Sequence, residues 1–399
     1  MTDTTNKLAR RVVEMPPSGI RKFFDYAMGM EGLISLGVGE PDFATPWAIR
    51  EAAVYAIEKG YTSYTSNLGL PRLRRAISDY LEQRWGVSYN PDTEVLITVG
   101  VSQGIDILMR AILDPGDEVI VLEPSYVSYK PMVLLTGAEP VVLPTYAKDD
   151  FAPDFALLER LITKKTKAVL LNYPTNPTGA TLRRPQLERL QQLADAHDLL
   201  LLTDEVYAEL TYGEEEHVAL PSLPGARERT VLLSGFSKAF AMTGWRIGYL
   251  AGPEPVISAA TKVHQYSMLC APIMGQMAAI EALKSGFGPL AEMKQEYFQR
   301  RNLIVKGLND LGLTCNMPPG AFYAFPNIES TGLSAEDFAW QLLGRHQVAL
   351  VPGSAFGECG TGHVRCSYAT ALDQIEEALA RIDMFLSEAR SGALASSQA

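Results

Sequence analysis

Short apolar runs alternate along the middle of the chain with longer segments in which apolar residues recur every three to four positions. Such runs are typical of buried strands, and the longer segments are typical of helices that pack on a sheet. We expect helices at 104–113 and at 186–195. The pattern predicts an α/β fold with a parallel-type sheet covered on both faces, its strands at 94–99, 118–122, 140–143, 167–171, 199–203, 231–233 and 247–251.

The pattern changes near Pro289, where a long amphipathic helix begins that reaches Gly307. Two strand-like pieces at 320–325 and 363–368 follow, and a closing helix begins after Leu372. These elements predict a second, smaller α+β domain.

Two domains are also expected from the length, because 399 residues exceed the size at which a single core usually keeps growing. A short helix at 18–27 is expected to pack with the C-terminal domain, and the aperiodic tail at 391–399 is expected to fray. The expected division is an N-terminal arm with part of the small domain at 1–45, a large domain at 46–288 and a small domain at 289–399.

The composition is that of an ordinary globular protein, with 47% hydrophobic and 20% charged residues. A formal charge of −11 disfavours nonspecific attraction to nucleic acid or to anionic membranes. Because the first residues lack the order of a secretory signal and no apolar run approaches a bilayer span, we expect a cytoplasmic protein. The four cysteines, which lack metal-ligand spacing, predict reduced thiols and no metal site: Cys270, Cys315, Cys359 and Cys366.

One lysine differs from the other charged residues because its neighbours are apolar. Lys238 lies between the apolar run 230–233 and the segment 239–241. Desolvation in such surroundings lowers the pKa of an ammonium group, and a neutral amine can form a Schiff base with an aldehyde. The alternative is a lysine at a strand end with its head group in solvent.

Ligands of open α/β sheets bind beyond the carboxyl ends of the strands, so the polar residues that follow the expected strands are site candidates. The segment 100–104, with Ser102 and Gln103, is a small-residue turn that opens a helix, and helix N-termini bind phosphate groups. Arg246 would add a bidentate phosphate contact. The alternatives are an ordinary tight turn and a surface ion pair.

Four further side chains follow other expected strands. Tyr126 is placed to stack on a flat ring, and Asn176 presents an amide at the sheet edge. Asp204 follows a strongly apolar strand, so its carboxylate needs a donor or a cation such as a protonated ring nitrogen. Tyr207 is expected on the same helical face as Asp204. The alternatives are core packing for Tyr126, a turn cap for Asn176 and a helix N-cap for Asp204.

Together these candidates match the groups that bind pyridoxal 5′-phosphate (PLP): a phosphate site, a ring platform, a carboxylate for a ring nitrogen, a phenol, an amide and a lysine that captures an aldehyde. At these residues the chain resembles the fold-type I PLP enzymes, and within them the class I/II aminotransferases, which include aspartate, aromatic and N-acetyl-diaminopimelate aminotransferases. The strongest matches are 176–179, 204–207 and 237–238 with Arg246. The resemblance implies a large domain with a mostly parallel mixed sheet and a smaller α+β domain.

The resemblance also implies a role for each candidate. Lys238 would bind the PLP aldehyde and transfer protons, Asp204 would keep the ring nitrogen protonated, and Tyr207 with Asn176 would bind the ring's phenolic oxygen. Tyr126 would stack on the ring. The residues implied to hold the phosphate are Ser102, Gln103, Ser234, Ser237 and Arg246, with Tyr64 reaching in from a second subunit of a homodimer.

Two further positions decide how closely the chain follows the family. Arg365 is implied to bind the substrate α-carboxylate, together with Asn176 and the backbone near Gly39; the alternative is a surface ion pair at a sheet edge. The chain departs from the family at Gly235, where the usual phosphate-binding serine is missing, so Ser234 or Ser237 must serve.

The implied reaction transfers an amino group from an L-amino acid to a 2-oxo acid, by the family's habit 2-oxoglutarate, with ping-pong kinetics. One alternative is a PLP-dependent lyase that eliminates a β-substituent, or an aminocyclopropane-carboxylate-synthase-like enzyme. Another is a non-catalytic PLP-binding or amino-acid-binding regulatory module, against which the presence of Lys238, Asp204 and Arg365 argues.

The amino acid itself is less well indicated. The segment 262–272 looks like that of the branch with aromatic and N-acetyl-diaminopimelate aminotransferases, which favours broad or aromatic specificity over dicarboxylate specificity. An apolar or aromatic pocket lining is expected from Ile20, Phe24, Tyr64, Tyr126 and Tyr323.

Overall fold

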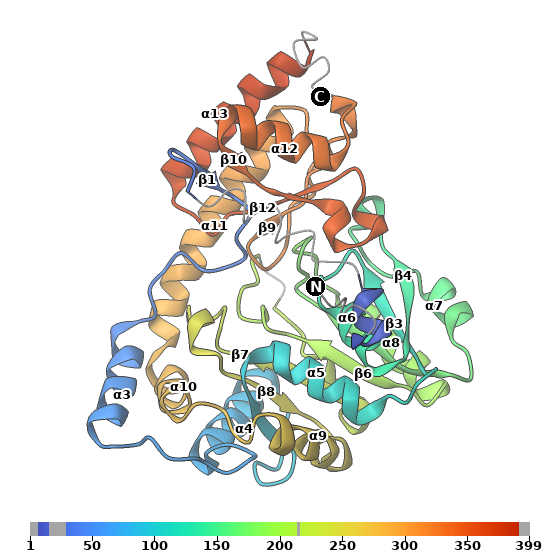
Figure 1. Cartoon of the computed structure of the whole chain (residues 1–399), viewed down its shortest axis with the longest axis vertical. Helices are drawn as coiled ribbons and strands as arrows, with labels where there is room; N and C mark the ends of the chain where they lie inside the picture. The colour runs from blue at the N-terminus through green and yellow to red at the C-terminus, as the bar shows by residue number, and fades with distance from the viewer. Residues whose placement is uncertain (1–6, 16–28, 214–215, 391–399) are drawn as a thin grey trace.

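The computed structural model describes residues 7–15, 29–213 and 216–390, with a larger part built on one broad sheet and a smaller part above it (Figure 1). The helix expected at 18–27, with Ile20 and Phe24, and the tail at 391–399 lie outside the described residues. Within the described ranges, no helix is long and apolar enough to cross a membrane.

A seven-stranded sheet forms the larger part, and its strands lie close to the expected runs: β2 (Val95–Thr98), β3 (Glu118–Glu123), β4 (Glu139–Pro144), β5 (Thr166–Asn172), β6 (Leu200–Asp204), β7 (Thr230–Gly235) and β8 (Gly248–Ala251). Their order is β2-β8-β7-β6-β5-β3-β4. Within this sheet, β8 runs in the direction opposite to the other six strands, so the sheet is mostly parallel and mixed, which confirms the expected fold class.

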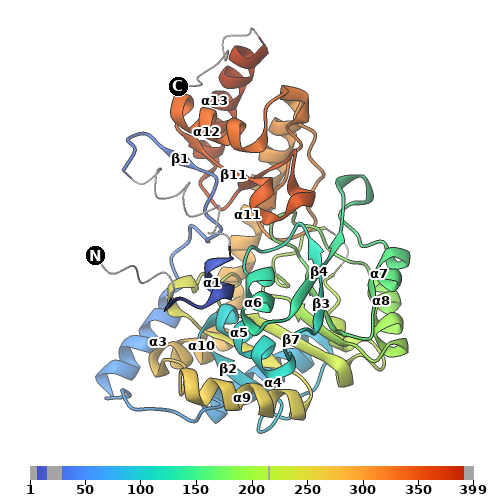
Figure 2. The same ribbon diagram turned by 45° about the vertical axis from the view of Figure 1, so that its right-hand side comes forward.

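Helices cover both faces of the sheet because successive side chains of a strand point into different apolar clusters. On β6, Leu201 packs in one cluster with α8 (Arg184–Ala196), whereas Leu202 packs in another with α5 (Gly100–Ile112). In Figure 2, α8 lies beside α7 at the side of the sheet. The remaining described α-helices of this part are α1 (Arg10–Val13), α3 (Trp47–Glu58), α4 (Pro71–Trp85), α6 (Tyr129–Thr136), α7 (Phe155–Leu161), α9 (Glu254–Ser267) and α10 (Ile273–Ser285).

In the described ranges, the smaller part contains a three-stranded antiparallel sheet, a two-stranded parallel sheet and three α-helices, of which α11 extends from the larger part up to it (Figure 1). The strand β1 (Ile34–Ser35) pairs in parallel with β10 (Val348–Ala349), so both ends of the chain contribute here. The domain boundaries remain a prediction; the one at 288/289 falls in the first turn of α11. The other elements are β9 (Tyr323–Ala324), β11 (Val351–Pro352), β12 (Val364–Ser367), α11 (Phe287–Asp310), α12 (Ala335–His346) and α13 (Leu372–Arg390).

Two local expectations were wrong. The helix α5 begins at Gly100 rather than at residue 104, because Gly100 adopts a φ of +71° that turns the chain from strand into helix. Tyr207 does not share a helix with Asp204, since the chain forms only a turn after β6. The Asp204 side chain accepts a hydrogen bond from the Val206 N–H there, and such local bonds compete with helix formation.

The strands β7 and β8 and the start of α5 meet closely at three glycines. A Cβ atom at Gly235 would lie 2.9 Å from Cα of Gly248, and one at Gly248 would lie 2.7 Å from the carbonyl carbon of Gly100. Backbone atoms on both sides leave no room for a methyl group, so glycine is required for these three elements to meet.

We expect Gly248→Ala to lower the free energy of unfolding by about 1–3 kcal/mol, because the added methyl must push β8 away from α5. Gly244→Ala is the matched control, since nothing lies within 4 Å of a Cβ at that position. Urea unfolding followed by circular dichroism measures both variants. Equal stability of Gly248→Ala and the unchanged protein would contradict the close approach.

Candidate active site

The Asp204 carboxylate lies at the carboxyl end of β6 and is buried, with 4% of the residue exposed. Tyr129 Oη donates to its Oδ2 at 2.7 Å, and the Val206 N–H donates to its Oδ1 at 3.1 Å. Loss of hydration raises the pKa of Asp204 to about 6, although both hydrogen bonds lower it. The two donors fix the carboxylate's orientation, and an adjacent cation would lower its pKa further.

The neighbouring strand connects Asp204 to Asn176. Asn172 is the register partner of Asp204, and its Nδ2 donates to the Asp204 carbonyl at 2.7 Å. Its Oδ1 accepts from the Asn176 N–H at 2.9 Å. Asn172 therefore holds two expected site residues together, although the sequence analysis did not name it.

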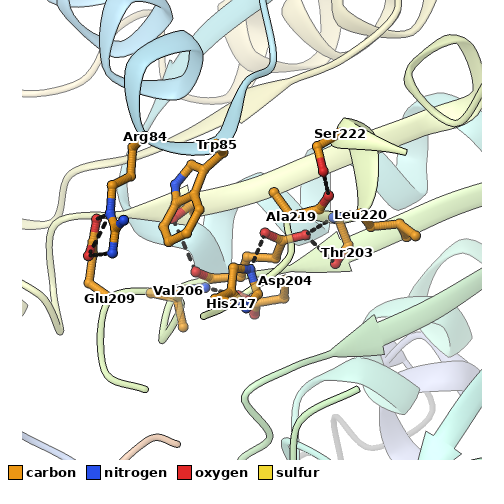
Figure 3. A network of polar contacts seen from close by, with 12 residues as sticks. Arg84, Trp85, Thr203, Asp204, Val206, Glu209, His217, Ala219, Leu220 and Ser222 are labelled. Carbon is orange, nitrogen blue, oxygen red and sulfur yellow. Dashed lines mark hydrogen bonds and ion pairs between the residues drawn. The ribbon is translucent and has the colours of Figure 1, made fainter. Parts of the chain in front are cut away.

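The segment after β6 carries Tyr207 and is anchored through Glu205 before that residue and through Glu209 after it; Figure 3 shows Glu209 beside Arg84. The buried Glu205 carboxylate accepts from His217 Nε2 at 2.7 Å and from the Leu220 N–H at 3.0 Å. Farther along, the Glu209 carboxylate lies 3.3 Å from Arg84 Nε. These contacts fix the turn in which Tyr207 lies.

Lys238 follows β7 and points toward the residues just described. Its Nζ donates to the Gly39 carbonyl at 2.6 Å and lies 6.0 Å from the ring centroid of Tyr207. Desolvation lowers the pKa of Lys238 to about 8; Glu40 opposes this shift, whereas the cations Arg365 and Arg246 add to it. The expectation of a desolvated lysine agrees with this environment, and the alternative of a solvated head group does not.

Arg365 on β12 is buried, with 3% exposed, and held in a fixed position. Its Nη1 donates to Asn176 Oδ1 at 2.8 Å and its Nη2 to the Gly37 carbonyl at 2.6 Å. The guanidinium lies 4.6 Å from the ring centroid of Tyr323 and 4.8 Å from that of Phe356. Among the described residues its buried Nε has no hydrogen-bond partner, so a donor remains for a carboxylate.

The start of α5 brings backbone N–H groups and a cation together. A Cβ atom at Gly100 would lie 2.6 Å from Arg246 Nη2, so this guanidinium lies against the first turn of the helix. Ser102 is exposed in that turn. Gln103 differs from the expectation, because its Oε1 accepts from the Val99 N–H at 2.7 Å and its Nε2 lies 2.9 Å from His264 Nδ1. Its side chain is therefore occupied within the protein.

The two candidate serines lie beside Lys238. Ser237 is 9% exposed, and Ser234 is half-buried with its Oγ 3.4 Å from the Glu205 carbonyl. The intervening Gly235 has a structural reason, because any Cβ there would meet the backbone of Gly248. The close approach of β7 and β8 therefore explains why glycine stands at position 235, where the family usually has a serine.

Two expected aromatic residues lie in different environments. Tyr126 is half-buried beyond β3, in an edge contact of 5.5 Å between ring centroids with Tyr129. Tyr64 is 84% exposed on the surface of the chain. Tyr64 therefore lies apart from the linked candidates, which are Asp204, Asn176, Tyr207, Lys238, Arg246 and Arg365.

The residues fit PLP in charge and in chemistry. The first turn of α5 with Arg246 suits a phosphate, Asp204 suits a protonated ring nitrogen, and the low-pKa amine of Lys238 suits an aldehyde. Within the described ranges, no group of three or more His, Cys, Asp or Glu residues could hold a metal ion. Besides Asn172, three neighbours of these residues were missed from the sequence, because their contacts arise only in the folded chain: Tyr129, Gly37 and Phe356.

Comparison with known proteins identifies the family to which the chain is similar. Residues 31–382 match the family of aminotransferases of class I and II. The aromatic-amino-acid aminotransferase 2 of Thermococcus litoralis is 44% identical over 383 residues, which cover 96% of this chain and 98% of that protein. The aspartate aminotransferase of Pyrococcus abyssi is 44% identical over 374 residues, which cover 93% and 96%. The crystal structure of an aromatic aminotransferase from Pyrococcus horikoshii has a TM-score of 0.89 at 42% identity and covers 93% of this chain and 99% of that chain.

These similarities confirm the expected family, cofactor and type of reaction, and they favour neither the lyase nor the regulatory module. Relatives named for aromatic and for aspartate substrates are equally similar, so likeness alone does not choose the amino acid. The chain belongs to the class I and II aminotransferases and is a PLP-dependent aminotransferase.

Proposed function

We propose that this aminotransferase moves an amino group from an L-amino acid to 2-oxoglutarate in two half-reactions, with Lys238 as the group that exchanges protons with the substrate. The observation that carries the proposal is the Lys238 amine. Its pKa lies near 8, and Asp204, Arg246 and Arg365 are close enough to act on its charge.

When bound, PLP supplies an aldehyde that exchanges amines and a ring that takes up electrons from the substrate Cα. The Lys238 amine then accepts the Cα proton on Nζ and returns a proton from the same atom. A group with a pKa close to the working pH serves in both directions, because neither its protonated nor its neutral form is scarce.

The other groups hold the reacting parts in place. Asp204 would accept the ring N–H and keep that nitrogen charged, Tyr207 and Asn176 would bind the ring oxygen, and Tyr126 would stack on the ring. Arg365, with Asn176 and the backbone near Gly39, binds the substrate α-carboxylate. The phosphate would be held by the first turn of α5 with Ser102, by Arg246, and by Ser237 or Ser234, whereas the Gln103 side chain is occupied by Val99 and His264.

The amino acid is proposed to carry an apolar or aromatic side chain. Aromatic residues surround the two cations of the site, since the Lys238 Nζ lies 5.8 Å from the ring centroid of Phe322 and Arg365 lies between Tyr323 and Phe356. Such surroundings favour burial of apolar atoms over a second carboxylate.

A homodimer is proposed, with Tyr64 of one subunit at the phosphate site of the other. Tyr64 is 84% exposed and Tyr266 is 88% exposed, and their segments lie together because Asn67 Nδ2 donates to the Leu269 carbonyl at 2.7 Å. On α3, Trp47 is also 61% exposed. Exposed aromatic residues gathered in this way are typical of a protein interface, and a second copy of the chain suits them.

We also propose a cytoplasmic location. All four cysteines are free thiols within the part of the chain that the structure describes, and two of them, Cys315 and Cys366, are buried. Free buried thiols suit a reducing compartment.

Lys238→Ala is expected to lower kcat by at least about a thousandfold, because both the covalent anchor and the proton acceptor are lost. The variant is expected to bind PLP without a borohydride-sensitive visible band. In the unchanged protein, amino acid alone is expected to convert PLP to pyridoxamine 5′-phosphate, which an eliminating lyase does not do. Lys262→Ala, at an exposed lysine of α9, is the control; near-normal turnover by Lys238→Ala would contradict the assignment.

The rate at which the cofactor-free protein captures PLP is expected to rise with pH through a midpoint near 8, because only the neutral amine attacks the aldehyde. An ordinary lysine would give a midpoint of about 10.4. Because the Glu40 carboxylate raises the pKa of Lys238, Glu40→Gln should move the midpoint to lower pH. Stopped-flow absorbance measures the rate, with Glu51→Gln on α3 as the control. A midpoint near 10 would show that Lys238 is solvated.

Mixed dimers test the shared site. We expect Tyr64→Ala to weaken PLP binding about tenfold while the protein stays a dimer of about twice 43.7 kDa in light scattering. Mixing Lys238→Ala with Tyr64→Ala should restore activity, since one site of the mixed dimer then holds both intact residues. Tyr146→Ala, at another exposed tyrosine, is the control. A monomer, or no recovery after subunit exchange, would contradict the proposal.

A further inference from the structure

Tyr323 lies between two groups that the proposed function uses for different purposes. Its Oη is 2.8 Å from Tyr207 Oη, and its ring centroid is 4.6 Å from the guanidinium carbon of Arg365. Tyr323 is 1% exposed, and its hydroxyl has no other hydrogen-bond partner among the described residues. One side chain thus contacts both the proposed ring-oxygen ligand and the proposed carboxylate ligand.

The small sheet fixes this position. Tyr323 on β9 is the register partner of Ser367 on β12, which is two residues from Arg365, so Tyr323 and Arg365 project from the same face of the sheet. Toward the larger part, a Cβ atom at Gly39 would lie 2.5 Å from Tyr323 Oη. The hydroxyl is thereby confined beside the segment that accepts a hydrogen bond from Lys238, and it points at Tyr207.

We propose that Tyr323 is a positioning residue. Its hydroxyl donates a hydrogen bond to the Tyr207 oxygen, so that the Tyr207 O–H is directed toward the ring oxygen of PLP. This role of Tyr323 rests on the proposed function of Tyr207. A phenol has one proton, so in a pair of hydroxyl groups only one donates to the other. An anionic oxygen on the far side of Tyr207 attracts its proton more strongly than a neutral hydroxyl does, and this orders the bonds from Tyr323 to Tyr207 to the oxygen.

The hydroxyl and the ring of Tyr323 have separable tasks. The ring forms one side of the stack that holds Arg365, with Phe356 on the other side. The hydroxyl contacts Tyr207. Tyr323→Phe therefore removes the hydrogen bond and keeps the stack and the volume, so substrate carboxylate binding should change little.

Loss of the donor should weaken the hydrogen bond from Tyr207 and leave the ring oxygen less well stabilised as an anion. Protonation of the lysine-linked cofactor then becomes easier, and the midpoint of its visible absorbance change should move up by about 0.5–1 pH unit. The charged or titratable groups that act on Tyr207 from the neighbouring elements are Tyr323, Arg365 and Asp204, and Lys238 lies over its ring. In Tyr323→Phe three of these four groups are unchanged.

The test is an absorbance titration of the PLP-loaded protein between pH 5 and pH 10. Tyr323→Phe is expected to raise the midpoint and to lower kcat about three- to tenfold, with KM for the amino acid changed less than about twofold. In the Tyr207→Phe background the same substitution should add no further shift, since Tyr323 acts through Tyr207. The control is Tyr212→Phe, which removes a buried hydroxyl that donates to the Ala321 carbonyl at 2.6 Å and so loosens the segment before β9.

An unchanged midpoint in Tyr323→Phe, an equal shift in Tyr212→Phe, or an additive shift in the double variant would overturn the proposal. If Tyr323→Phe does not fold, fluorotyrosine at position 323 replaces it; a more acidic phenol is a better donor, so the midpoint should move down. No movement there overturns the proposal as well. If the unchanged protein lacked any borohydride-sensitive band, the proposed function itself would be wrong. This outcome differs from an unchanged midpoint in Tyr323→Phe, which contradicts the role of Tyr323 alone.

Discussion

The desolvation of charge at the carboxyl edge of the sheet is the constraint around which this molecule is organised. Asp204 loses its water at the end of β6, and Lys238 and Arg365 lose theirs nearby. The charged form of each group has a higher free energy there than in water. Oriented partners such as Tyr129, Asn176 and the Gly37 carbonyl reduce this cost. In the proposed function, a phosphate, a ring nitrogen and a substrate carboxylate would offset the desolvation that these contacts leave uncompensated.

The same constraint explains why the reactive residues are placed on strands and on a well-anchored turn. Parallel strands place Asn172 and Asp204 side by side, and a buried network around Glu205 holds the turn that follows. A reacting group must be held within fractions of an ångström, which elements of a packed sheet provide better than free loops. The smaller part completes the site by bringing Arg365 and Tyr323 to this edge.

Much of this could be predicted from the sequence because it depends on local pattern. Apolar runs located all seven strands, and the residues after them included Asp204, Asn176 and Lys238. The direction of β8 could not be predicted, since strand pairing is not encoded in a run of apolar residues. The contact of Tyr129 with Asp204 could not be predicted either, because it joins residues 75 positions apart through the packing of α6.

The low pKa of Lys238 makes the cofactor-free protein chemically reactive at this side chain. An amine whose pKa is near 8 is a strong nucleophile at physiological pH, whereas most surface lysines are protonated and inert. Before PLP binds, Lys238 is therefore expected to react with small aldehydes and with cyanate from ageing urea solutions. The cofactor thus acts also as a protecting group, and a preparation kept saturated with vitamin B6 phosphate should retain activity that a stripped one steadily loses.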